Sequence, residues 1–292
     1  PANQVEGWGI SGVVDYEVAD NIAFKSITGY RTYDSFSSDD NDNSPVAFIG
    51  AVPSYFSHKQ FSQEVRLSGN FMEDALNVTV GGIYYDASTR YNGRIHSPFS
   101  GFGTAQKPTF SFINDDTADM TVWAGFGNAA WQLAPGLTLE GGIRVTSEQK
   151  DYTYGRYNPD GVGDYLPLSN PANPLSGQVG SYKETIVDYR AVLSYKVTPD
   201  VMAYAQFATG HKAGGVAPRP YSYYQIRSFG PEKLNSYEVG FKADLFDRIL
   251  RINASAFYMD YVGYQGTPQT CLDEAGNPLP VDKGGVEGLC GQ

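Results

Sequence analysis

The side chains best suited to binding chemistry lie in one stretch after position 210. It combines cationic and aromatic residues: His211, Lys212, Arg219, Tyr221, Tyr223, Tyr224 and Arg227. Cations pair with negative charge and aromatic rings stack on flat groups, so together they suit an anionic, partly aromatic solute. The alternative is that such a loop is aromatic because its side chains fold over one another. We take these residues as the candidate ligand-binding set and keep the self-packed loop as the alternative.

Catalytic patterns are missing from the sequence. The histidines His58, His96 and His211 are far apart, with no nucleophile pattern or metal-ligand spacing beside them. No G-x-S-x-G, H-E-x-x-H or P-loop motif occurs. We therefore expect no enzyme, no catalytic residue, no metal site and no cofactor.

Two other stretches resemble binding motifs but lack required parts. Gly7, Gly9 and Gly12 spell the G-x-G-x-x-G pattern, yet residues 13 to 17 continue as a strand instead of opening a helix. The acidic run at residues 38 to 43, which contains Asp39, Asp40 and Asp42, offers closely spaced oxygens for a hard cation. It lacks the central Gly and the closing Glu of an EF-hand, so we interpret it as a solvated loop. Cation binding there stays open.

Composition limits the class of partner. The 292 residues carry a formal net charge of −11, which argues against nucleic acid because phosphate binding needs a clustered basic surface. No run of about 18 apolar residues occurs, which excludes a transmembrane helix. Mean hydropathy is low, but a membrane barrel alternates its lipid-facing residues and averages to polar. Low hydropathy therefore does not indicate a soluble protein.

The chain has two cysteines, Cys271 and Cys290, both in its last segment. That segment carries Pro278, Pro280 and several glycines but no strand pattern. Two thiols close in sequence suit an oxidising compartment. We predict a disulfide between them in an extracellular-type loop, where it would restrict the disordered states by about 3 kcal/mol.

Apolar and polar residues alternate along most of the chain, which indicates strands with two unlike faces. Burying the charged face in a dry core would be unfavourable, whereas a watery lumen removes the difficulty. The predicted lipid-facing side chains are Trp123, Trp131, Leu137, Leu139, Ile143, Val145, Val239, Phe241, Leu250 and Ile252. The predicted inward-facing side chains are Glu140, Arg144, Glu238 and Lys242. The two tryptophans lie about 20 Å apart along a barrel axis, a spacing that suits two interfacial girdles, or alternatively a soluble core.

The expected strands are joined by short turns and long loops in alternation. Long connections are expected at residues 36 to 57, 90 to 117, 152 to 182 and after 210, with tight turns between them. Short turns at one end and loops of roughly 20 to 30 residues at the other are the layout of an outer-membrane barrel. A soluble β-sandwich or propeller is the alternative, but its strand spacing is usually shorter and more even.

The amino-acid sequence of residues 201 to 261 resembles that of the barrel domain of TonB-dependent outer-membrane receptors. The resemblance rests on several pieces in order: Gly210, Lys212, Gly214 and Gly215, then Pro231-Glu232, then Tyr237-Glu238-Val239-Gly240-Phe241-Lys242, and finally Phe257-Tyr258-Met259-Asp260-Tyr261. His211 stands where the family usually has an aromatic residue, which is a mild departure. The resemblance covers nearly the whole chain and is most specific from Gly210 to Tyr261.

The resemblance implies an all-β fold: an antiparallel transmembrane β-barrel of 22 strands, of which this chain shows about ten. We expect residues 1–292 to be part of that barrel domain, without the N-terminal plug, the TonB-contact motif and the C-terminal strands. It also implies uptake of a scarce solute, with a ferric siderophore as the default and vitamin B12 or oligosaccharides as other cargoes of the family.

The same resemblance implies the partners and the location. The partners would be outer-membrane lipid and lipopolysaccharide, the TonB complex through the absent N-terminal region, and a small solute such as a ferric chelate. The location would be the bacterial outer membrane. A passive porin or a purely structural barrel is the alternative function.

Overall fold

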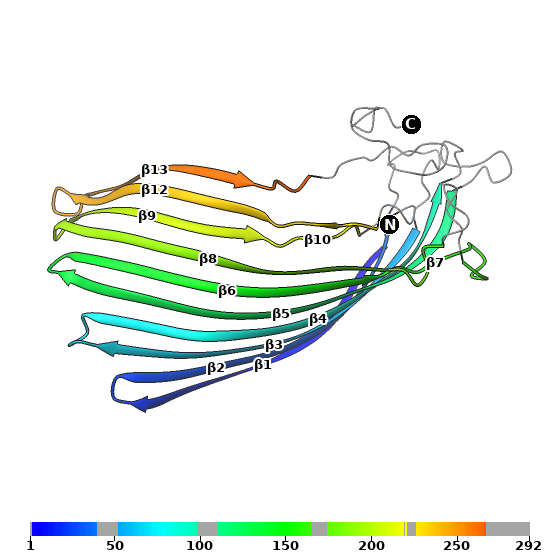
Figure 1. The fold of residues 1–292 in the computed structure, drawn as a ribbon, viewed down its shortest axis with the longest axis horizontal. Helices are drawn as coiled ribbons and strands as arrows, with labels where there is room; N and C mark the ends of the chain where they lie inside the picture. The colour runs from blue at the N-terminus through cyan, green and yellow to red at the C-terminus, as the bar shows by residue number, and fades with distance from the viewer. Residues whose placement is uncertain are drawn as a thin grey trace.

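The computed structural model describes residues 2–39, 52–97, 110–164, 174–218, 220 and 226–266. Ten long strands form one antiparallel sheet in which each strand pairs with the next long strand along the chain (Figure 1). They are β1 (Ala2–Ala19), β2 (Ile22–Asp39), β3 (Val52–Phe71), β4 (Leu76–Ser97), β5 (Phe110–Ala134), β6 (Leu137–Thr153), β8 (Val179–Thr198), β9 (Val201–Lys212), β12 (Glu232–Leu245) and β13 (Leu250–Val262).

Three short strands lie at the long-loop end of the sheet. β7 (Arg156–Tyr157) pairs with β5, and β10 (Gly215–Val216) pairs with β11 (Ser228–Phe229). The described residues contain no helix that is long and apolar enough to cross a membrane. The prediction of an all-β antiparallel fold with about ten strands is confirmed.

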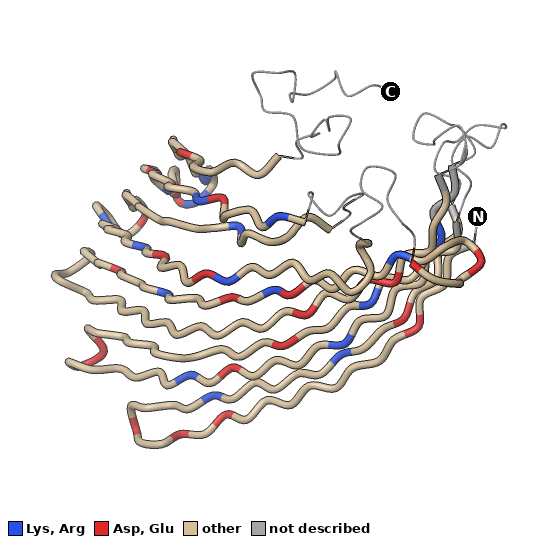
Figure 2. The backbone as a smooth tube through the Cα atoms, turned by 45° about the vertical axis from the view of Figure 1, so that its right-hand side comes forward, with Lys and Arg blue, Asp and Glu red and all other residues tan. Residues whose placement is uncertain are grey.

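The sheet is curved, as Figures 1 and 2 show from two directions. Side chains on the concave face converge and therefore lose more solvent contact than those on the convex face. β8 shows this alternation: Ile186 and Val192 are buried, whereas Val187 and Leu193 are exposed. Within the described residues β1 and β13 each pair on one side only, so the described sheet is open at both edges.

The predicted assignment of faces is confirmed. Leu139, Ile143 and Val145 are exposed on the convex face of β6, and Glu140 and Arg144 between them are less exposed on the concave face. The cross-strand registers carry the same two faces from β5 to β13. In one row, Trp131 pairs with Leu139, and Leu139 pairs with Leu193. The next two pairs continue that row, from Leu193 to Ala205 and from Ala205 to Val239.

Aromatic rings form a row across the convex face, which we call the upper aromatic row. Its members are Trp8, Tyr30, Phe61, Tyr84 and Trp123 on β1 to β5, and Phe207, Tyr237 and Tyr258 on β9, β12 and β13. Ring centroids are 5.4 Å apart between Trp8 and Tyr30, 4.4 Å between Tyr84 and Trp123, and 5.1 Å between Phe207 and Tyr237. Such rows mark the boundary between hydrocarbon and water around a membrane barrel. Trp131 lies on the same convex face nearer the turns and is 43% exposed, as a second girdle requires.

The concave face carries polar side chains that bond to one another. Arg190 donates to Glu140 at 3.0 Å and to Gln206 at 3.3 Å, so one guanidinium links β8 to β6 and β9. Lys25 pairs with Asp15 at 3.1 Å. Figure 2 shows such cationic and anionic positions interspersed along the strands. A polar interior of this kind suits a water-filled or protein-filled lumen rather than an apolar core.

The strands run further toward the long-loop end than the sequence pattern indicated. The loops were expected at residues 36 to 57 and 90 to 117, but β2 continues to Asp39, β3 begins at Val52, β4 continues to Ser97 and β5 begins at Phe110. The apolar alternation stops where the convex face leaves the lipid, whereas backbone pairing continues above it. The alternation of apolar and polar residues therefore indicated how far the apolar band of the convex face extends, but it did not indicate where the strands end.

Candidate ligand-facing surface

An aromatic platform lies on the concave face near the long-loop end of β2, β3 and β4. We define it by the rings of Tyr33, Phe56, His58 and Tyr91. Tyr33 stacks on Phe56 with 5.4 Å between centroids, and Phe56 meets Tyr91 edge-on at 4.9 Å. The His58 ring lies 5.1 Å from the Tyr33 ring. The platform offers flat apolar surfaces on which a planar solute can stack.

Strand register brings these rings together. Tyr33 pairs with His58 across β2 and β3, and Phe56 pairs with Tyr91 across β3 and β4. Phe56 and His58 are two positions apart on β3 and therefore point to the same face. The residue between them, Ser57, is exposed on the convex face. The four rings come from three strands, one from β2, two from β3 and one from β4. The platform is therefore not visible in any single stretch of the sequence.

Two hydrogen bonds fix the His58 ring. Its Nε2 lies 3.1 Å from Oε1 of Gln60, and its Nδ1 lies 2.8 Å from Oγ1 of Thr89. Because an amide oxygen only accepts, Nε2 donates its proton to Gln60, whereas the Thr89 hydroxyl can serve Nδ1 as either donor or acceptor. Tyr85 also donates to Gln60 Oε1, at 3.4 Å. The network holds the imidazole against the neighbouring rings.

Arg31 places a cation beside the platform. It pairs with Gln60 across β2 and β3, and its side chain shares the concave face with Tyr33. Arg31 is exposed and forms no ion pair with any residue that the structure describes. Stacking surfaces next to an available guanidinium suit a flat solute that carries negative charge.

A second aromatic group packs at the long-loop end of β6 and β8. It includes residues from the connections that follow β6 and β9. Tyr154, Tyr182 and Val216 form a buried cluster, and Tyr152 and Ile226 pack against it. Tyr154 donates its hydroxyl to the carbonyl of Ala217 at 2.6 Å, and burial raises the pKa of Tyr154 to about 12. The cluster therefore joins the connection after β6 to the connection after β9.

A buried ion pair holds the connection after β6 against β5. Arg156 and Asp116 are each 3% exposed and pair with one another. The guanidinium of Arg156 lies 5.5 Å from the ring of Phe112 and 5.8 Å from that of Tyr154. The Gly155 N–H donates to Asp116 Oδ1 at 3.0 Å. Desolvation raises the pKa of Asp116 above its ordinary value, and Arg156 offsets part of that rise.

The candidate ligand-binding residues that fall within the described structure have different roles. His211 Nδ1 lies 2.6 Å from Asp188 Oδ2, and both side chains are largely buried, so this histidine ties β9 to β8. Lys212 ends β9 and is exposed. The Arg227 carbonyl accepts from the Ala217 N–H at 3.1 Å within the described part of the loop.

The remaining sequence predictions fall outside the described residues. These are the ligand-contact residues Arg219, Tyr221, Tyr223 and Tyr224, the disulfide pair Cys271 and Cys290, and the acidic positions Asp40 and Asp42. Asp39, at the edge of that acidic run, ends β2. Ligand contact by the loop after position 210 stays a prediction. Among the described residues, no group of three or more histidine, cysteine or acidic side chains has the arrangement of a metal site.

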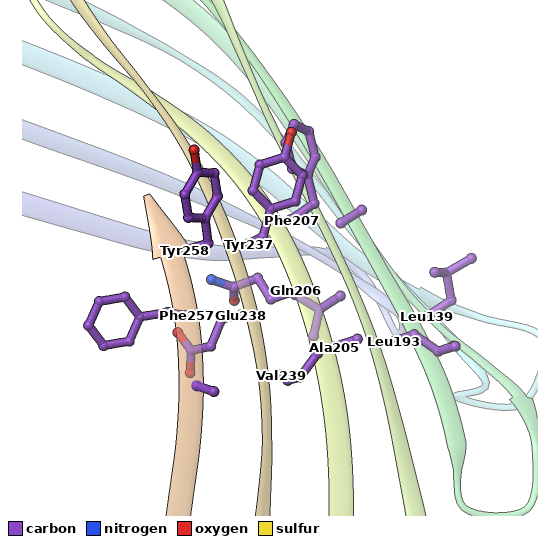
Figure 3. Close-up of a pocket in the computed structure, with 13 residues that line it drawn as sticks. Leu139, Leu193, Ala205, Gln206, Phe207, Tyr237, Glu238, Val239, Phe257 and Tyr258 are labelled. Carbon is purple, nitrogen blue, oxygen red and sulfur yellow. The ribbon is translucent and has the colours of Figure 1, made fainter. Parts of the chain in front are cut away.

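An apolar groove of about 590 Å³ crosses β8, β9, β12 and β13 on the convex face (Figure 3). The rings of Phe207, Tyr237 and Tyr258 stand along one side of it, and Leu193 and Val239 stand along the other. These side chains belong to the face that carries the upper aromatic row. The groove therefore faces lipid, and solute contact belongs to the opposite face.

Sequence reasoning missed the platform, because it placed Phe56 and Tyr91 inside loops. The available signal was the spacing of Phe56 and His58 by two positions, continuous in phase with the strand that follows. That signal identifies a face but not its neighbours. The pairing of β2 with β3 and of β3 with β4 was needed to bring the other rings to it.

The sequence matches the family model described as TonB dependent receptor-like, beta-barrel over residues 3–280. The chain belongs to this family. Family members are transport receptors of the outer membrane and not enzymes, so this TonB-dependent receptor barrel lies in the outer membrane. The family membership that the sequence motifs indicated is confirmed.

Solved structures share the fold of this receptor barrel at low sequence identity. The ferric yersiniabactin uptake receptor FyuA from Yersinia pestis is 20% identical with a TM-score of 0.67, over 89% of this chain and 36% of that one. The siderophore receptor PiuA from Acinetobacter baumannii is 17% identical with a TM-score of 0.60, over 87% and 40%. The copper transporter OprC is 14% identical with a TM-score of 0.60, over 87% and 38%. The chain thus spans well under half the length of these proteins.

Proposed function

We propose that this chain is part of an outer-membrane receptor that binds a ferric siderophore and imports it with energy from the TonB complex. In this proposal a plug domain fills the lumen and further strands complete a barrel of 22, both in parts of the protein beyond this sequence. The proposal extends family membership to a particular activity, partner and cargo.

The observation that carries the choice of cargo is the aromatic platform with Arg31 beside it. A ferric chelate with aromatic ligand groups presents flat surfaces and negative charge, and the concave face offers stacking rings and a guanidinium. The platform lies at the long-loop end, where a solute from outside would arrive first. Siderophore receptors stand among the structural neighbours, whose low identity supports the fold alone.

The first experiment tests energised uptake by the full-length receptor in whole cells. Cells lacking their other iron receptors would be given iron-labelled chelates with either aromatic or aliphatic ligand groups. We expect surface binding of an aromatic chelate with or without TonB, and accumulation inside the cell only with TonB. Equal accumulation in both strains would contradict the proposal and favour the alternative of a passive porin.

The second experiment tests the platform itself. Replacing Tyr33 and Phe56 by Ala should weaken binding of the aromatic chelate to cells by about thirtyfold, since each of the two stacked rings contributes on the order of 1 kcal/mol. Phe61→Ala is the matched control, because Phe61 is an aromatic residue of the same β3 but faces lipid. Equal affinity in the double variant and the control would remove the platform from the site.

A third set of variants addresses the loop after position 210. Replacing Arg219, Tyr223 and Arg227 by Ala should weaken chelate binding without lowering the amount of receptor in the outer membrane, because the long strands are left intact. Positive charge and aromatic faces at the outer mouth would meet an anionic solute first despite the acidic total. Unchanged affinity in this triple variant would support the self-packed loop instead.

A further inference from the structure

The connection between β9 and β12 carries the candidate ligand-binding residues after position 210, and its two stems pair with one another. β10 pairs with β11, and a bond of 3.1 Å from the Ala217 N–H to the Arg227 carbonyl extends the pairing by one position. We call residues 213–217 and 226–230 the stem ribbon. In the sequence it flanks Arg219, Tyr221, Tyr223 and Tyr224. The position of the ribbon therefore determines the point from which the chain presents these side chains.

Side chains from β6, β8 and the connection after β6 hold the first stem at two points. The Tyr182 hydroxyl accepts from the Gly214 N–H at 3.1 Å, and Lys150 Nζ donates to the Gly214 carbonyl at 2.9 Å. Tyr154 donates its hydroxyl to the Ala217 carbonyl at 2.6 Å. Both backbone groups of Gly214 are thus bonded to side chains of the wall.

Carboxylates on the same strands orient two of these anchors. Tyr182 donates its own proton to Glu184 at 3.0 Å, which leaves its oxygen lone pairs to accept from the stem. Lys150 pairs with Glu148 at 2.9 Å. All these contacts are made within the chain, so holding the stem requires no bound solute.

Gln265, from the connection after β13, joins the two stems at their base. Its Nε2 donates to the Ala213 carbonyl at 2.9 Å and to the Gly230 carbonyl at 3.0 Å, and the Lys212 carbonyl lies at 3.4 Å. Its backbone N–H donates to Glu232 Oε2 at 2.8 Å. Ala213 precedes β10 and Gly230 follows β11, so one amide ties the beginning of the ribbon to its end.

A fixed ribbon differs from a loop that becomes ordered only when it closes on a solute. Segments that move on binding come from the least stable parts of a structure, which make few buried contacts. The stem ribbon instead packs Val216 into the buried cluster with Tyr154 and Tyr182, in addition to its hydrogen bonds. A loop that is already ordered avoids the entropy cost of ordering it on binding.

We propose that the stem ribbon is fixed before a solute binds, and that Tyr154 and Gln265 are positioning residues. They place the ligand-binding residues of the loop without contacting the solute themselves. The inference rests on the part of the proposed function that assigns solute contact to this loop. The fixed ribbon can be tested without any solute, which separates the two.

The first experiment measures hydrogen exchange in the purified full-length receptor without a chelate. The latch variant combines Tyr154→Phe with Gln265→Met, which removes a hydroxyl and an amide and keeps side chains of similar size. The N–H groups of Gly214 and Ala217 report on the ribbon, because neither of them bonds to a substituted side chain. We expect both to be protected in the parent and to exchange at least tenfold faster in the variant, the lower end for three lost hydrogen bonds of ordinary net strength.

The matched control for the latch variant combines Tyr204→Phe with Gln206→Met. It removes the same two groups from the concave face of β9, where they contact Glu238 and Arg190 instead of the ribbon. Exchange in the control should equal that of the parent. Exchange at the open-chain rate in the parent, or equal exchange in the latch variant and the parent, would overturn the inference.

The second experiment measures binding of the aromatic chelate to cells. Adding Gly214→Ala to the latch variant should open the ribbon outright, because the new Cβ would lie 2.2 Å from the Phe229 carbonyl oxygen. We expect this open variant to bind about tenfold more weakly than the parent, the lower end of the cost of ordering three side chains on binding. Normal amounts of receptor in the outer membrane would show that it folds.

Combined variants separate positioning from a general loss of structure. Replacing Arg219, Tyr223 and Arg227 by Ala should weaken binding in the parent and add little in the open variant, because the loop is then no longer placed. Replacing Tyr33 and Phe56 by Ala should cause its full loss in both. Full additivity with the loop changes, or unchanged affinity in the open variant, would overturn the positioning role. A parent that binds no chelate would contradict the proposed function, and hydrogen exchange would still decide whether the ribbon is fixed.

Discussion

At the scale of single residues, the close approach of the Gly214 and Phe229 backbones explains one of the glycines in the family motif after Gly210. A Cβ added to Gly214 would lie 2.2 Å from the carbonyl oxygen of Phe229 and 2.4 Å from the ring of Tyr182. The Gly214 N–H also donates to the Tyr182 hydroxyl at 3.1 Å, and Lys150 Nζ donates to the Gly214 carbonyl at 2.9 Å. Only glycine fits at this point, where the loop after β9 packs on β8.

Gly214→Ala should therefore loosen the loop after β9 by about 1 to 3 kcal/mol, because the backbone of Phe229 must move. Gly210→Ala is the control, since a Cβ there meets nothing within 4 Å. Cleavage of surface-exposed loops by an added protease on intact cells measures the effect. We expect faster cleavage for Gly214→Ala and parental cleavage for Gly210→Ala. Equal rates in the two variants would mean that the loop is not held by this contact.

The buried carboxyl of Asp116, which lies above the upper aromatic row, gives a pH prediction. Because desolvation raises its pKa in the folded loop above the ordinary value of 3.8, the folded loop binds a proton more readily than the open loop. The stabilising contribution is then fully present below pH 3.8 and is lost as the pH rises through the folded pKa. Protection of the Gly155 N–H from hydrogen exchange, corrected for the intrinsic rate, should increase on acidification from neutral pH. A decrease would show that the ion pair with Arg156 dominates.

At the scale of elements, two tight turns at the inner end of the sheet adopt an unusual backbone. The turns between β3 and β4 and between β12 and β13 each contain three consecutive non-glycine residues at positive φ. They are Met72, Glu73 and Asp74, with φ of 57°, 55° and 68°, and Phe246, Asp247 and Arg248, with φ of 55°, 54° and 67°. In each turn an N–H to carbonyl bond of 3.1 Å closes the loop, from Ala75 to Met72 and from Ile249 to Phe246. Left-handed backbone at L-residues is strained by about 1 kcal/mol per residue.

Glu73→Gly should consequently stabilise the barrel by about 1 kcal/mol, because glycine adopts positive φ without strain. Gly136→Ala is the opposite control, since Gly136 already has a φ of 79° in the turn before β6 and an added Cβ would lie 3.0 Å from the Lys196 carbonyl. Urea unfolding of the full-length receptor in lipid vesicles measures both. A stabilised Gly136→Ala, or a destabilised Glu73→Gly, would contradict this account of the turns.

At the scale of the whole molecule, a curved sheet separates a lipid face from a polar interior. Ile143 and Arg144 are adjacent on β6 but face opposite environments, and Ile143 is 48% exposed on the convex side between the levels of Trp123 and Trp131. The sheet can therefore tolerate a charge at one position and not at the next. Within the described residues the two edges at β1 and β13 are unpaired, and a spanning sheet requires closure of its edges. The proposal of additional strands in the full protein meets that requirement.

Ile143→Arg should cost about 2 to 4 kcal/mol, the range for a cation placed on the lipid face near the bilayer middle. Asn128→Arg is the control for charge itself, because Asn128 is exposed on the concave face of the neighbouring β5, where it pairs with Gly142 at the level of Ile143. The amount of heat-modifiable receptor in outer-membrane fractions measures folding. Loss of Ile143→Arg with retention of Asn128→Arg is the expected result, and equal loss would show that an added charge, not lipid, decides the outcome.

Much of this protein is determined locally by its sequence. Alternation at residues such as Leu139, Glu140 and Ile143 identified strands and assigned their faces, because side chains of a strand point to opposite sides whatever its neighbours are. The motif pieces from Gly210 to Tyr261 identified the family for a similar reason, since each piece meets a local requirement, such as the missing Cβ at Gly214.

Only the tertiary structure decided where strands end and which side chains meet. The alternation fades above the membrane, so β2 and β5 extend past the boundaries that the pattern indicated. The platform of Tyr33, Phe56, His58 and Tyr91 draws on three strands, and its composition depends on cross-strand register. Register is set by backbone pairing between distant segments, and a shift of one position would move every ring to the other face. The sequence of one strand does not specify which residues the neighbouring strands place beside it. The platform could therefore be found only once the sheet was assembled.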